Sequence, residues 1–181
     1  MGVFTLLWGS WTIQGFGVFA VVTVAASTAL AAVFLVRGIA LFIAAPTLVS
    51  AEAVQAAQDA RTGYRFRLVV GAETLAILLV SLALGTTGHD RYVNPAIALV
   101  VGLHFLALVA VFPTRRTVNL VTGSVLSLAA IGAVVLLASR AAGTDVVWSA
   151  VALIAASCTS AQGLTLLAAR RRLLDATTAA E

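Results

Sequence analysis

The stretch LVVGAETLAILLVSLALG, residues 68–85, is apolar almost throughout and carries one charged side chain, Glu73. A membrane-spanning helix needs about 20 predominantly apolar residues, and this run is close to that length. A second run, NPAIALVVGLHFLALVAVF (residues 94–112), contains a single ionisable side chain, His104. Ionisable groups at such a depth in a bilayer are costly, so each is a candidate functional residue.

The composition of the whole chain is that of an integral membrane protein. Of its 181 residues, 61% are hydrophobic and 10% are charged, and its mean hydropathy is +1.08. A soluble domain is about 25% charged, and a soluble fold of this length could not bury so much apolar surface. We therefore expect a single transmembrane helical domain over residues 1–181, solvated by the lipid bilayer.

Four spanning segments are clear, and the first 51 residues are ambiguous. The segments cover residues 66–84, 95–112, 118–138 and 146–169. Residues 3–45 are long enough for two more spans, but no strong turn divides them. The sequence predicts an all-α bundle of about six transmembrane helices, with five as the alternative. Residues 47–66, rich in alanine, are expected to form a helical cytoplasmic connector.

All eleven basic residues are arginine, and their distribution predicts the topology. Arginines cluster at residues 61–67, 115–116 and 170–172, whereas the alternate loops carry Arg91 or Arg140 beside an aspartate. Cytoplasmic loops carry the excess of basic residues. We expect a bacterial plasma membrane protein with a cytoplasmic C-terminus. The same rule explains the net charge of +4 without a nucleic-acid partner.

Three helices place a polar side chain between the inner interface and the midplane. At about 1.5 Å of rise per residue, Glu73, His104 and Gln162 lie about 9, 16 and 12 Å from the flanking arginines. Glu73 and His104 are the expected reactive pair. The alternatives are a structural ion pair or hydrogen bond of Glu73 with His104 or Arg37, a helix-packing role for His104, and interhelical hydrogen bonding for Gln162. The substrate-binding candidates around the pair are Gln162, Arg37, Asn119 and Thr159.

Small residues predict where helices pack closely, and the single cysteine limits the disulfide and metal sites that the chain could form. Ala98 with Gly102, and Gly123 with Ser127, have the four-residue spacing that permits close helix approach. Cys158 is the only cysteine, which excludes an internal disulfide and a cysteine-rich metal site. We expect no metal site and no cofactor.

The stretch from Asn94 to Leu106, NPAIALVVGLHFL, resembles a family of small bacterial multi-span membrane proteins that carry Gly-Leu-His-Phe in a transmembrane helix. These proteins also carry a glutamate in the preceding helix, where this chain has Glu73. The resemblance extends over residues 61–125, and the short first helix departs from the pattern. It implies that Glu73 and His104 belong together, and it supplies no mechanism.

Three functions fit these features. The first is a bundle that binds or transports a small molecule, with or without proton coupling. Many transporters contain an internal repeat, which this chain lacks, but a homodimer would supply the same symmetry. The second is a membrane-embedded enzyme in which Glu73 protonates an isoprenoid or other lipid, as in a terpene-cyclase-like reaction, with His104 as base or orienting group. The third is a non-catalytic membrane subunit or sensor. Whether the protein is an enzyme is left open by the sequence.

Overall fold

The computed structural model describes Trp8, residues 18–44 and residues 52–178, and this part of the chain is helical with no strand. This confirms the predicted all-α class. Two short 3-10 turns, η2 (Asp90–Tyr92) and η3 (Pro113–Arg115), connect long helices. The long helices are α3 (Val18–Ala44), α4 (Glu52–Thr86), α5 (Val93–Val111), α6 (Arg116–Ala138) and α7 (Thr144–Thr178).

The four clear spans of the sequence are confirmed as helices long and apolar enough to cross a membrane. They cover Arg61–Thr86, Asp90–Val111, Pro113–Ala138 and Thr144–Thr165. Residues 52–66 of the expected connector are helical and continue into the first of these spans without a break, whereas residues 47–51 lie outside the described part. The helix expected before α3 also falls outside it, apart from Trp8.

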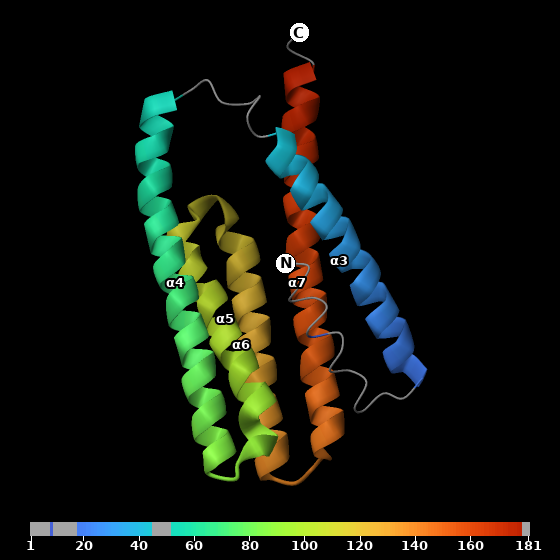
Figure 1. The fold of residues 1–181 in the computed structure, drawn as a ribbon. Helices are drawn as coiled ribbons and strands as arrows, with labels where there is room; N and C mark the ends of the chain where they lie inside the picture. The colour runs from blue at the N-terminus through green and yellow to red at the C-terminus, as the bar shows by residue number, and fades with distance from the viewer. Residues whose placement is uncertain (1–7, 9–17, 45–51, 179–181) are drawn as a thin grey trace.

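The helices are arranged around α5, which packs against α4, α6 and α7 (Figure 1). On the far side, α3 packs against α7, where Phe34 lies directly against Gly163. In contrast, α4 makes its helix contacts with α5. In the most apolar stretch of α4 no residue is buried, whereas half of the residues in the most apolar stretch of α7 are buried. The apolar surface of α4 is therefore available to lipid.

The tightest contact in the bundle is between α5 and α6, at the small residues. A Cβ atom on Gly102 would lie 2.5 Å from Ser127 Oγ and 2.8 Å from Ser127 N. A Cβ atom on Gly123 would lie 2.8 Å from the carbonyl oxygen of Gly102. The close approach expected from the small-residue spacing is thus present, and it fixes α5 against α6.

The arginine-rich segments lie at one end of the bundle. Figure 1 shows the turn between α5 and α6 and the C-terminal end of α7 at the same end, with α4 entering the bundle from there. The connections 87–92 and 139–143 lie at the opposite end. There the indole N–H of Trp148 donates a hydrogen bond to the backbone carbonyl of Arg91 at 2.9 Å. This bond ties the start of α7 to the turn before α5.

Candidate functional site

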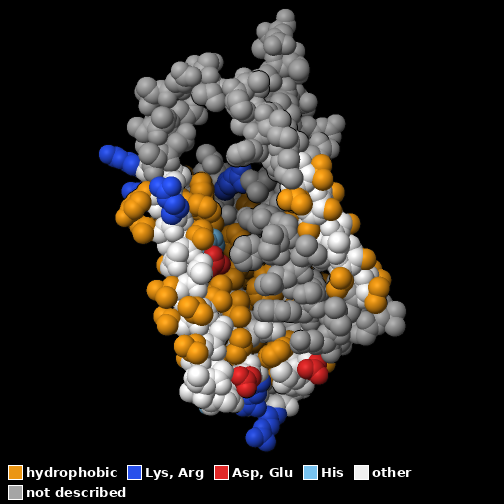
Figure 2. Space-filling model, in the orientation of Figure 1, with side chains coloured by type: hydrophobic (Ala, Val, Ile, Leu, Met, Phe, Trp, Pro, Cys, Tyr) orange, Lys and Arg blue, Asp and Glu red, His pale blue; other side chains and the backbone are white. Residues whose placement is uncertain are grey.

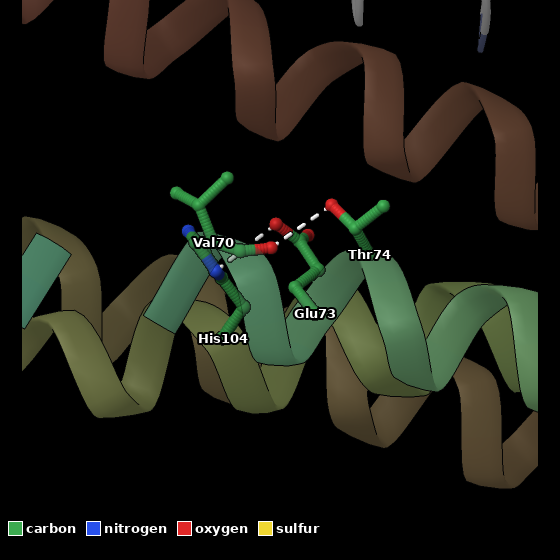
Figure 3. Close-up of polar contacts among 4 residues, drawn as sticks. All are labelled: Val70, Glu73, Thr74 and His104. Atoms are coloured by element: carbon green, nitrogen blue, oxygen red, sulfur yellow. Dashed lines mark hydrogen bonds and ion pairs between the residues drawn. The ribbon is translucent and has the colours of Figure 1, made fainter. Parts of the chain in front are cut away.

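The one ion pair in the described part of the chain joins α4 to α5 inside their spans. Oε2 of Glu73 lies 3.0 Å from Nδ1 of His104, and each side chain is 9% exposed. Figure 3 shows the carboxylate and the imidazole pointing toward each other across the two helices. The two groups expected from the sequence to belong together are therefore in contact.

The backbone of α4 also lies close to the imidazole. Val69, whose backbone is near His104, precedes Glu73 by four residues, which is one helical turn. The imidazole therefore lies between two successive turns of α4. Nδ1 is buried and has no well-aligned hydrogen bond, so its contact with Glu73 is electrostatic, without the alignment of a hydrogen bond.

Thr74 lies beside Glu73 but takes no part in the pair. Its hydroxyl donates to the backbone carbonyl of Val70 in its own helix at 2.9 Å, and the residue is exposed (Figure 3). Such a bond to the carbonyl four residues earlier satisfies a threonine hydroxyl locally. Thr74 is therefore a suitable matched control for changes at Glu73.

The charge of the pair depends on a single proton. With one proton held between Glu73 and His104, the pair is neutral overall, whichever group holds it. Removing that proton leaves one negative charge, and adding another leaves one positive charge. Uncompensated charge is costly at membrane depth, so the one-proton state is favoured unless a ligand supplies the missing charge.

A second polar pair joins α6 to α7. Nε2 of Gln162 donates to Oδ1 of Asn119 at 3.3 Å, and both residues are buried. Thr122 is buried on the same side of α6. Thr159 is buried on α7, and its hydroxyl bonds the carbonyls of Ala155 and Ala156 in its own helix.

The two polar pairs are separate. In the described part of the chain, no hydrogen bond or ion pair connects Glu73 or His104 with Asn119 or Gln162. Arg37 lies in α3, and its side chain is outside the described part. The structure thus brings four of the six expected site residues together as two bridges, Glu73 with His104 between α4 and α5, and Asn119 with Gln162 between α6 and α7.

The sequence reasoning treated Ser127 only as a small residue for helix packing. Its hydroxyl is buried beside Gly102 of α5 and has no hydrogen-bond partner in the described structure. Among the described residues, no group of three histidine, cysteine or acidic side chains could hold a metal ion. The fold and the polar pair define the class as an integral membrane protein of long apolar helices, two of which are joined by a carboxylate–imidazole contact inside their spans.

Comparison with protein-family models, curated proteins and solved structures finds no match to this chain. The function is therefore inferred from the geometry of the bundle itself. The contact between Glu73 and His104 is its most informative feature, because the remaining described charges lie at the two ends of the spans.

Cys158 should react slowly with water-soluble maleimides in the folded protein. The residue is half-buried in the middle of α7, and its side chain packs against the apolar core. Thiol reactivity requires an accessible thiolate. A Thr87→Cys variant that also carries Cys158→Ser supplies the matched control, since Thr87 lies in an exposed turn. Labelling of Cys158 as fast as that of the control would reveal water reaching the middle of α7.

Proposed function

We propose that this protein is a multi-pass protein of the bacterial plasma membrane that binds or transports a small molecule through proton exchange at Glu73 and His104. The observation that carries the proposal is the 3.0 Å contact between these two side chains, one helix each, inside the spanning segments. Buried acid and histidine groups in transmembrane helices are typical of proton pathways.

The charge balance of the pair favours a solute that carries one positive charge. When the proton leaves, Glu73 and neutral His104 together carry one negative charge. No other described charged side chain lies in the middle of the spans to compensate it. A monocationic solute would compensate the charge, so its binding and the loss of the proton are coupled. The amide pair of Asn119 and Gln162 offers further polar groups between α6 and α7.

Proton movement in proteoliposomes tests this proposal. Purified protein is reconstituted with a pH-sensitive dye inside, and organic monocations are added one at a time under an imposed pH gradient. We expect at least one of them to release protons through the wild-type protein and through Thr74→Val, but not through Glu73→Gln. Equal proton movement with wild type and Glu73→Gln would contradict it.

One observation favours the enzyme as a second candidate. Glu73 lies on α4, the helix whose apolar surface is least covered by protein, so a lipophilic substrate could reach the seam between α4 and α5 from the bilayer. As a carboxylic acid, Glu73 could then protonate an olefin, with His104 orienting it. Conversion of an added isoprenoid by wild type, lost in Glu73→Gln, would favour this candidate over transport.

The proposed topology has six spans, with the arginine-rich end and both termini in the cytoplasm. The 27 residues of α3, which could cross the bilayer, support a fifth span, and the arginine distribution supports the cytoplasmic side for the C-terminus. Reporter fusions at Thr114 and Gly88, at opposite ends of α5, should report opposite sides, with Thr114 inside. Cytoplasmic signals from both positions would contradict the topology.

A further inference from the structure

The structure places two arginine-bearing segments side by side at one end of the bundle. The rings of Phe66, on α4, and Phe112, at the end of α5, meet edge to face with their centroids 5.8 Å apart. Arg65 and Arg67 flank Phe66 in the sequence. Arg115 follows Phe112 by one 3-10 turn, and its backbone N–H donates to the carbonyl of Phe112 at 3.0 Å. The aromatic contact therefore places the two segments that carry these arginines side by side.

These guanidinium groups are exposed and have no acidic partner. Arg65, Arg67, Arg115 and Arg116 are all exposed, and in the described part of the chain none forms an ion pair. Figure 2 shows arginine side chains gathered near this end of the visible face, above the apolar side chains. Arg91, at the opposite end, differs because it follows Asp90 and its guanidinium lies 4.8 Å from the centroid of the Tyr92 ring.

The position and chemistry of this cluster fit a phosphate group at the membrane surface. The cluster lies where the apolar stretches of α4 and α5 end, since Arg65 and Arg67 are in the first two turns of the span Arg61–Thr86 and Arg115 follows the end of α5. In the proposed topology, this end of the bundle faces the lipid headgroups on the cytoplasmic side. A guanidinium binds a phosphate through two parallel hydrogen bonds, a geometry that lysine does not provide. Basic sites between transmembrane helices are able to bind anionic headgroups.

We propose that the arginines around the Phe66–Phe112 contact form a binding site for the phosphate headgroup of an anionic phospholipid. The acyl chains of the lipid would lie along the exposed apolar surface of α4, which carries Leu68 and Leu75 below the arginines. This site is independent of the Glu73–His104 pair and of the proposed transport. It would fix the outermost helix of the bundle to the bilayer surface.

Native mass spectrometry of the full-length protein, released from nanodiscs of phosphatidylcholine and phosphatidylglycerol, tests the proposal. We expect wild type to retain phosphatidylglycerol selectively. The double variant Arg65→Gln/Arg115→Gln should bind it roughly 25-fold more weakly, at about fivefold per arginine. The control Arg91→Gln/Arg140→Gln removes the same charge from the opposite end and should retain the lipid as wild type does.

The variant Arg65→Lys/Arg115→Lys keeps the charge that directs insertion, so it tests the site even if the glutamine variant fails to fold. Loss of the two-point phosphate contact should reduce retention in the lysine variant as well. The proposal is overturned if wild type retains both lipids equally, if the two glutamine variants lose the lipid equally, or if the lysine variant binds as tightly as wild type.

Discussion

Replacing Glu73 with glutamine should leave a folded bundle that no longer exchanges protons. Glutamine keeps the size and a polar contact with His104, but it removes the group that shares the proton. Replacing Glu73 with alanine should also lower the free energy of unfolding by about 0.5–2 kcal/mol, the range found for polar contacts between transmembrane helices. Unfolding in mixed micelles and proton release from proteoliposomes measure the two effects.

Thr74→Val is the matched control for both variants, because Thr74 is adjacent in α4 and its hydroxyl bonds only its own helix. It should resemble wild type in stability and in proton release. A purely structural role would give the opposite pattern at Glu73, with full proton release in Glu73→Gln and loss of stability in Glu73→Ala alone.

Replacing Gly102 with alanine should destabilise the bundle more than the same substitution at any other described glycine of α4, α5 or α6 except Gly123. The new Cβ atom would lie 2.5 Å from Ser127 Oγ and 2.8 Å from Ser127 N, so a backbone atom of α6 must move as well as a side chain. Overpacking of this kind costs about 1–3 kcal/mol. The measurement is unfolding in mixed micelles.

Gly132→Ala and Gly71→Ala are the controls, since a Cβ atom at either position meets nothing within 4 Å. Both should be neutral or slightly stabilising, because alanine is a better helix former than glycine by up to about 1 kcal/mol. Equal stability of Gly102→Ala and Gly132→Ala would mean that α5 and α6 are not in the close contact described.

Hydrophobicity predicted the spanning helices because the bilayer requires long uninterrupted apolar runs. The same reasoning selected Glu73 and His104, because each apolar run held one ionisable side chain between an arginine-rich end and the middle of the bilayer. The small residues around Gly102 and Gly123 predicted close helix contact for a simple steric reason, namely that a larger side chain would keep the helices apart.

The arrangement of the helices could not be predicted in the same way. Lipid-facing and protein-facing surfaces are both apolar, so the sequence of α4 does not show that it lies at the outside and packs against α5. The same holds for the contact between Phe34 and Gly163, since nothing in either segment points to the other. Separation of the polar residues into two pairs also depends on helix rotation, which depth along a helix does not specify.

A double-mutant cycle between Glu73→Ala and His104→Ala tests the central claim most directly. The free energy of unfolding of wild type, both single variants and the double variant is measured in one mixed-micelle system. Because the two side chains are in contact, we predict a coupling of about 0.5 kcal/mol or more, so that the second substitution costs less once the first is present. Additive losses would contradict the account, since they would show that Glu73 and His104 act independently and share no proton.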